Sequence, residues 1–205
     1  MIRIGLDAMG GDFAPEVAVE GAVMALKKVG KDSRIVLFGD KERILELLKK
    51  HKCSAENFDI VGTTEVIEMH DHPAKAFASK KDSSMTVGFN YLKEGKIDGF
   101  ASAGSTGAVL TGGFLKIGRI KGVQRPALCP LIPTISGGRV ALCDCGANMD
   151  CKPEYLEQFA MMGSAYMTIL GVKKPKVALL NVGNGDNGIG VSNCTCVANL
   201  TAAFA

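Results

Sequence analysis

Residues 97–110 read IDGFASAGSTGAVL. The run that ends near Ala101 is typical of a short strand, Ser102–Gly107 forms a tight turn of glycine and hydroxyl residues, and the helix that follows is predicted to end near Gly118, where glycine suits a left-handed cap. Such a turn leaves backbone N–H groups without partners at a helix N-terminus, and the helix dipole adds partial positive charge there. The turn could therefore cradle a phosphate without a basic residue inside it.

The same turn also has a purely structural explanation, because glycine and serine often end a strand and cap a helix. The loop alone does not decide between the two interpretations. It matches neither the G-x-x-x-x-G-K-[ST] phosphate loop nor the G-x-G-x-x-G dinucleotide turn. Nucleotide-binding functions, including that of a dinucleotide-dependent dehydrogenase, are therefore disfavoured.

Composition indicates a globular α/β protein. The 205 residues suffice for one sizeable core, and 25 glycines with few aromatic residues suit many tight strand–helix turns. The net charge of +3 comes from scattered lysines and arginines, which does not indicate nucleic-acid binding. The start of the chain lacks the apolar run of a signal peptide and no run reaches transmembrane length, so we expect a soluble, cytoplasmic protein.

Metal binding is not expected. The seven cysteines have no zinc-site spacing and are predicted to be reduced thiols that pack as small apolar residues. His70 and His72 flank Asp71 before a proline, but no third ligand lies near them in the sequence, so a solvated loop is the better interpretation. No cofactor is predicted.

Strands and helices alternate along the chain, which favours a parallel sheet covered on both faces. Four glycine turns follow predicted strands, and ligands of open α/β sheets bind outside the carboxyl ends of the strands. A functional site is therefore expected where these turns meet. The turns span residues 7–12, 102–107, 144–148 and 181–185.

A further polar segment reads KKDSS, residues 80–84, and precedes an apolar helix. Asp82 or a serine could cap that helix, and the two lysines would then lie beside its N-terminus. In isolation the segment is more typical of a solvated basic pair and an ordinary cap than of a second set of anion donors.

Five segments in order resemble the bacterial phosphate acyltransferases (acyl-ACP:phosphate acyltransferases) of fatty acid and phospholipid synthesis. They read DAMGGD (7–12), KKDSSM (80–85), SAGSTG (102–107), RPA (125–127) and GANMDCKPE (146–154). The resemblance implies a three-layer α/β/α fold with a mostly parallel sheet, similar to isopropylmalate dehydrogenases and phosphate acetyltransferases. It covers residues 1–183 and leaves 184–205 as a divergent tail.

The resemblance also implies a reaction and its partners. Inorganic phosphate attacks the thioester of a long-chain acyl-acyl carrier protein and gives acyl phosphate, which feeds a membrane glycerol-3-phosphate acyltransferase. Members of the family are homodimers that associate peripherally with the membrane. Two alternatives stay open: a short-chain phosphotransacylase that uses acyl-CoA, and an inactive fragment that binds only phosphate or carrier protein.

The turn pattern and the resemblance together assign roles. Gly104, Ser105, Thr106 and Gly107 are expected to bind phosphate. Lys81, Asp82 and Ser83 are candidates either for binding phosphate or for supporting the residues that bind it. Lys81 is also a catalytic candidate. Asn148 and Lys152 are expected to polarise the thioester carbonyl, whereas Asp7 and Asp12 orient donors because carboxylates repel phosphate.

Two departures from the family pattern stand out. Ser105 occupies a position where the family usually has asparagine, a mild change because hydroxyl and amide groups both donate hydrogen bonds. Residues 184–196 lack the charged, helical character that the family has there, and the chain stops short of family length. We therefore expect a truncated or frame-shifted family member.

Overall fold

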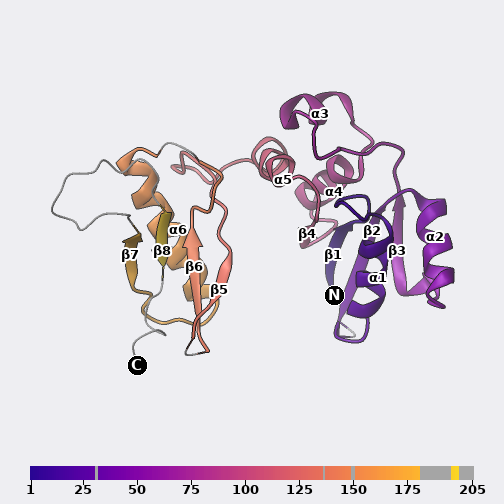
Figure 1. Ribbon diagram of the computed structural model, residues 1–205, viewed down its shortest axis with the longest axis horizontal. Coiled ribbons are helices and arrows are strands. Elements are labelled where there is room, and N and C mark those ends of the chain that lie inside the picture. The colour runs from indigo at the N-terminus through magenta and orange to yellow at the C-terminus, as the bar shows by residue number, and fades with distance from the viewer. Residues whose placement is uncertain (31, 136, 149–150, 181–194, 199–205) are drawn as a thin grey trace. The chain divides into compact units, whose positions relative to one another are not determined.

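The computed structural model describes residues 1–30, 32–135, 137–148, 151–180 and 195–198, and the chain divides into two compact units (Figure 1). The first unit spans Met1–Gly118 and the second spans Arg119–Ala205. Each unit has its own four-stranded sheet. The domain boundary expected after residue 183 lies outside the described residues, and so does the turn expected at 181–185.

The sheet of the first unit is parallel throughout. Its strands are β1 (Ile2–Asp7), β2 (Ser33–Gly39), β3 (Phe58–Gly62) and β4 (Gly99–Ala101), in the spatial order β3-β2-β1-β4. β1 pairs with β4 through Ile4 opposite Gly99 and Leu6 opposite Ala101. The carboxyl ends of β1 and β4 are therefore neighbours, which places the turns that follow these strands at one edge of the sheet.

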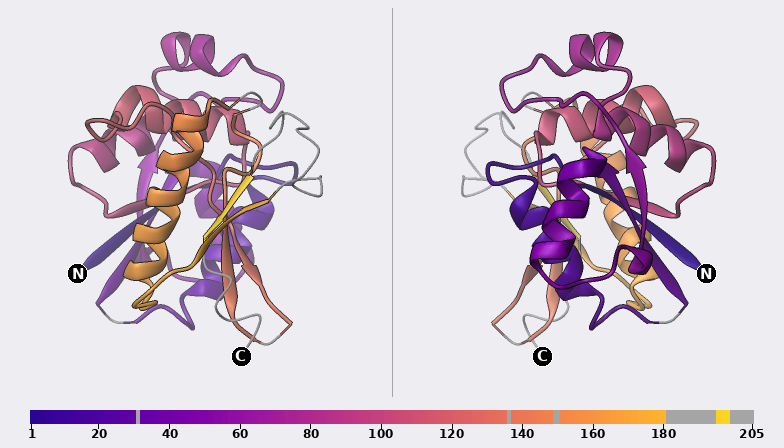
Figure 2. Two further views of the ribbon diagram at one scale, coloured as in Figure 1. Left: turned by 90° about the vertical axis from the view of Figure 1, so that its left-hand side faces the viewer. Right: turned by 90° about the vertical axis from the view of Figure 1, so that its right-hand side faces the viewer.

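Helices cover both faces of this sheet, as the alternating side chains of β2 require. Ile35 and Leu37 face a core shared with α1 (Glu16–Ala25) and α2 (Lys41–Lys50). Val36 and Phe38 point to the other face, where α4 (Ser84–Lys93) packs. The right-hand view of Figure 2 shows purple helical turns lying over one face of the strands. The three-layer α/β/α prediction is thus confirmed in this unit.

Shorter helical segments complete the first unit. They are η1 (Ala55–Asn57), α3 (Pro73–Ser79), α5 (Thr106–Gly112) and a π-helical turn, η2 (Gly113–Ile117). α5 and η2 form one continuous helical run that ends at Gly118, whose φ of 90° is in the region that favours glycine. The predicted end of this helix is confirmed.

An ion-pair cluster links β1, β2 and β3 near their amino-terminal ends. Asp59 on β3 accepts hydrogen bonds from Arg3 (2.7 Å) and Arg34 (3.0 Å). Partial burial of Asp59 acts to raise its pKa, but the two guanidinium groups outweigh burial and hold the pKa of this carboxyl below its usual range. The cluster therefore stabilises the fold only while Asp59 is ionised.

The second unit is built on an antiparallel sheet, whereas the sequence predicts a mostly parallel one and gives no sign of this difference between the units. β5 (Leu131–Pro133) and β6 (Arg139–Cys143) pair antiparallel, because the short turn between them is too brief for a parallel crossover. β8 (Thr195–Ala198) and β7 (Val177–Leu180) extend this sheet in the order β5-β6-β8-β7. The long helix α6 (Pro153–Ile169) packs on it through Phe159 and Met167.

Across the described ranges, no helix has both the length and the apolar composition that crossing a bilayer requires.

Candidate functional site: glycine turns at the carboxyl ends of β1 and β4

Asp7 joins the two glycine turns of the first unit. Its carboxylate is almost completely buried and accepts a hydrogen bond from the Ser102 hydroxyl (2.7 Å) and another from the Met9 N–H (3.0 Å). The Ser102 oxygen in turn accepts a hydrogen bond from the Gly104 N–H (3.0 Å). Asp7 therefore fixes the Ser102 hydroxyl, which in turn holds the Gly104 N–H.

Gly10 shows how closely the turns pack. A Cβ at this position would lie 2.5 Å from Asp7 Oδ2, 2.7 Å from Ser102 Oγ and 2.9 Å from the Gly104 nitrogen. These distances leave no room for any side chain. The first turn thus needs glycine at position 10 in order to lie against the second.

The helix that follows the central turn starts at Thr106. The Ser105 hydroxyl, which is buried, accepts a hydrogen bond from the Ala108 N–H (3.3 Å) and so caps the helix. Within the described part of the chain, the N–H groups of Thr106 and Gly107 and the Thr106 hydroxyl make no hydrogen bond. These groups are exposed, and they are the donors of this loop that a phosphate could reach.

The KKDSS segment mainly organises its own surroundings. Asp82 accepts two hydrogen bonds from Thr64, through its N–H (2.9 Å) and its hydroxyl (2.6 Å). Lys80 is also engaged, since its ammonium donates to the Val66 carbonyl (2.8 Å). Lys81 is exposed, and no partner of its ammonium is found among the described residues. Lys81 is therefore the cation of this segment that a ligand could engage.

Ser83 does not fit the phosphate-binding role assigned to it. Its side chain is fully buried, where the hydroxyl contacts the Lys80 carbonyl (3.0 Å) and the Thr86 hydroxyl (2.8 Å) and caps α4 by accepting from the Thr86 N–H (3.2 Å). The hydroxyl has neither exposure nor spare hydrogen-bonding capacity. Ser83 instead holds the start of α4 in place.

The start of α4 lies against the central turn. A Cβ on Gly104 would come within 3.4 Å of the Met85 Cε atom, and Met85 shares a core cluster with Ala108 of α5. The first unit thus gathers Asp7, the central turn and the beginning of α4 in one region. Asp12 is exposed, and no hydrogen bond of its carboxylate occurs among the described residues.

Asn148 belongs to the second unit, and its side chain is engaged. The amide nitrogen donates to the Pro126 carbonyl (2.9 Å) and to Asp144 Oδ2 (3.1 Å). An amide group has two N–H donors, so both are used in this arrangement. Polarising a thioester carbonyl would require one of these hydrogen bonds to break, which argues against Asn148 as a ready donor.

The organiser of this loop is Asp144, which the sequence analysis did not single out. It is buried and accepts hydrogen bonds from the Leu128 N–H (2.7 Å), the Asn148 N–H (2.8 Å) and the Asn148 side chain. The available signal was its position: like Asp7, it directly follows a strand and precedes a glycine turn.

Lys152 immediately precedes α6 and is exposed, and no partner of its ammonium occurs within the described ranges. Three residues after it, the ring of Tyr155 has the Arg125 guanidinium 5.8 Å from its centre. The candidate residues are therefore divided between two units: the predicted phosphate donors belong to the first, and Asn148 and Lys152 belong to the second.

Thr63 is a second residue that the sequence gave no reason to select. It follows β3 at the same carboxyl edge of the sheet, and its buried hydroxyl has no hydrogen-bond partner among the residues that the structure describes. No group of three or more histidine, cysteine, aspartate or glutamate side chains among the described residues is placed to hold a metal ion.

A family model described as "Fatty acid synthesis protein" matches residues 2–201. The chain belongs to this family. The resemblance drawn from the five sequence segments is thereby confirmed, because relatives named phosphate acyltransferase match across almost the same range.

Among these relatives, phosphate acyltransferases of Dictyoglomus turgidum and Clostridioides difficile are each 49% identical over 183 residues, which is 89% of this chain. That of Bacillus licheniformis is 45% identical over 186 residues. The matches cover 53–55% of the relatives, so the chain spans about half their length.

A solved structure, a branched-chain phosphotransacylase from Enterococcus faecalis, superimposes with a TM-score of 0.56 and 15% sequence identity. The match covers 85% of this chain and 54% of that one. At this identity the likeness concerns the fold alone, and it agrees with the fold predicted for the family.

Proposed function

We propose that this chain is a phosphate acyltransferase that transfers a long-chain acyl group from acyl carrier protein to inorganic phosphate and so forms acyl phosphate. The observation that carries the proposal is the hydrogen bond from Ser102 to the buried Asp7, which fastens the two glycine turns together. Family membership supplies the reaction class, and the turns supply a place for the anion.

In the reaction, a phosphate oxygen attacks the thioester carbonyl carbon. The C–S bond then breaks, and the products are acyl phosphate and the thiolate of the carrier. Phosphate is largely dianionic near neutral pH and a thiolate leaves readily, so a strong general base is not needed. The enzyme must instead hold the dianion against the carbonyl carbon and stabilise the tetrahedral oxyanion.

The N–H groups of Thr106 and Gly107 and the Thr106 hydroxyl are the proposed phosphate donors. They lie at the start of a helical run of 12 residues, Thr106–Ile117, where N–H groups and the helix dipole both favour an anion. Gly104 and Ser105 shape this loop through the Gly104 N–H and the Ser105 cap. Lys81 is the proposed cation, because its ammonium is exposed and makes no ion pair among the described residues.

Lys152 keeps its predicted role at the thioester carbonyl. Two features support it: the ammonium is exposed, and the residue lies in the GANMDCKPE segment that the family shares. For Asn148 we propose a positioning role, in which the residue and Asp144 fix the loop that precedes Lys152. Acyl carrier protein as donor, a homodimeric assembly and a cytoplasmic location with peripheral membrane association remain parts of the same proposal.

The test is phosphate-dependent release of carrier thiol from a long-chain acyl-acyl carrier protein by the 205-residue chain. The expected result is thiol release that requires phosphate and falls at least tenfold in Thr106→Ala, Lys81→Ala and Lys152→Ala. Lys93→Ala is the matched control, since Lys93 is an exposed lysine at the end of α4.

A parallel reaction with acyl-CoA separates the donors. Release from a short-chain acyl-CoA alone would overturn the carrier-protein donor in favour of a short-chain phosphotransacylase. No phosphate-dependent release from either donor would reject catalysis by this chain. Unchanged rates in all three variants would reject the proposed residues.

A further inference from the structure

An apolar groove runs along α1 in the first unit. Its volume is about 570 Å³, which lies within the range of small-molecule sites. The walls come mainly from β1, α1 and the start of β2. Apolar residues from these elements include Ile4, Leu6, Val17, Ala18, Ala22 and Ile35.

The groove extends along the length of β1. Asp7, Gly10 and Ala103 line one end, which is the edge that carries the glycine turns. Ser33 and Arg34 line the other end, and they pair with Ile2 and Arg3 at the start of β1. At about 3.3 Å per residue, six residues of β1 correspond to about 20 Å. The groove is therefore long, and one end lies at residues of the first two glycine turns, Gly10 and Ala103.

We propose that this groove receives the hydrocarbon chain of a fatty acyl thioester, with the carbonyl at the glycine turns and the methyl end toward Ser33. The inference rests on the proposed function, because it takes the turns as the place of reaction. The inference adds the site that binds the acyl chain. Residues of β1 and α1 would then determine which acyl-chain lengths the protein prefers.

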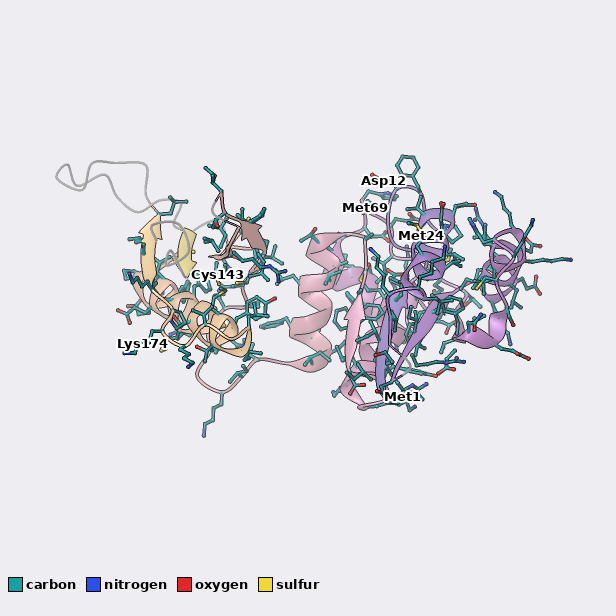
Figure 3. The ribbon with its side chains drawn as sticks, turned by 90° about the horizontal axis from the view of Figure 1, so that it is seen from below. Met1, Asp12, Met24, Met69, Cys143 and Lys174 are labelled. Atoms are coloured by element: carbon teal, nitrogen blue, oxygen red, sulfur yellow. The ribbon has the colours of Figure 1, made fainter. Side chains whose placement is uncertain are left out.

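Charge at the end of the groove favours a thioester over a free fatty acid. Asp7 and the exposed Asp12 both line this end, and Figure 3 shows Asp12 on the opposite side of the first unit from Met1. A carboxylate ligand in the groove would bring a third negative charge beside them, and the phosphate donors Thr106 and Gly107 do not line this end to offset it, whereas a thioester carbonyl is neutral. The groove thus combines an apolar length with an end that tolerates an uncharged head group.

Gly21 offers a direct way to fill the groove. It lines the wall on α1, and a Cβ built there meets no atom within 4 Å. A Cβ at this position displaces no neighbour, so Gly21→Phe adds a ring to the groove wall without a clash of its first side-chain carbon. Gly21→Ala is the small matched control. Glu20→Phe adds the same ring to an exposed position of the same helix that does not line the groove.

The test measures binding calorimetrically, without phosphate, using N-acetylcysteamine thioesters of hexanoic and decanoic acid. Each buried methylene strengthens binding about fourfold, so four more should give at least a tenfold gain even if burial is partial. Decanoate should bind at least tenfold more weakly than its thioester. Gly21→Phe should weaken binding of the decanoyl thioester at least tenfold, and both controls should leave it within twofold.

Equal affinity for the two thioesters would overturn the proposal, and this result does not depend on any variant. The proposal would also be overturned if Gly21→Phe bound the decanoyl thioester as tightly as the wild type while its circular dichroism spectrum was unchanged. Self-association that Gly21→Phe abolishes would assign the groove to a second copy of the chain and overturn the acyl occupant.

The same measurements separate this inference from the proposed function. Length-dependent binding without acyl transfer to phosphate would support the groove and reject catalysis by this chain. Acyl transfer that is insensitive both to chain length and to Gly21→Phe would support catalysis and reject the groove.

Discussion

Replacing Gly10 with alanine tests the packing on which the candidate site depends. The backbone of Gly10 is outside the left-handed region, so alanine introduces no conformational strain. Its Cβ, however, would lie within 3 Å of Asp7 Oδ2, Ser102 Oγ and the Gly104 nitrogen. The substitution therefore acts by pushing the two turns apart.

The magnitude follows from two effects. Overpacking of a tight site costs about 1–3 kcal/mol. Weakening the hydrogen bond that Ser102 donates to the buried Asp7 carboxylate costs up to about 1.5–3 kcal/mol more. Because the turns can relax partly toward solvent, we expect the free energy of unfolding to fall by about 2–4 kcal/mol.

Gly21→Ala is the control with the same chemical change. Gly21 lies inside α1 and a Cβ there meets nothing within 4 Å, so alanine should stabilise the helix by about 1 kcal/mol. Unfolding in urea, monitored by hydrogen exchange of peptides from the first unit, measures the free energy of unfolding of both variants. Unfolding of the second unit does not contribute to this signal. If Gly10→Ala unfolds within 0.5 kcal/mol of the wild type, the turns do not approach as described.

Three further predictions concern stability and reactivity. Ser83→Ala should destabilise the chain by about 1–2 kcal/mol, because the cap of α4 is lost and buried partners are left unpaired; urea denaturation measures this loss. Asp59→Asn should cost up to about 1 kcal/mol at pH 7, since the ion pairs are partly exposed. The lowered pKa of Asp59 means that its stabilisation is complete above about pH 4 and is lost as the pH falls further, so melting temperatures of wild type and variant should converge there. Cys145 is exposed and should react with a thiol reagent before Cys129, because burial raises the pKa of the Cys129 thiol; mass spectrometry of labelled peptides measures the order, labelling of Cys129 at least as fast would contradict it, and Cys145→Ser should leave the rate at Cys129 unchanged.

The meeting of the first two turns could be predicted from the sequence by one general rule. Parallel strands end at a common edge, so glycine turns after successive strands are expected to converge. The sequence did not show that β1 and β4 are neighbours, because Ile4 and Gly99 are 95 positions apart and neither carries a pairing signal. The hydrogen bond between Asp7 and Ser102 depends on that pairing, so only the fold reveals it.

The errors among candidate residues have a common physical cause. A serine before a helix looks the same in sequence whether its hydroxyl faces solvent or the core, and Ser83 is fully buried. Asn148 looks like a donor, but both of its N–H groups are taken by the Pro126 carbonyl and Asp144. Residue type indicates which hydrogen bonds are possible, whereas tertiary neighbours decide which of them remain for a ligand.

β1 links the two proposed binding sites. Ile4 and Leu6 line the groove, and the next residue, Asp7, ends the strand and holds the glycine turns. An acyl chain along β1 and a phosphate at its carboxyl end would therefore be held in a fixed relation by one rigid element. This arrangement predicts that Gly21→Phe should weaken binding of the acyl chain and leave phosphate binding intact, whereas Gly10→Ala, at a residue that also lines the end of the groove, should weaken both. Loss of phosphate binding by Gly21→Phe would mean that the groove and the turns do not act as distinct sites.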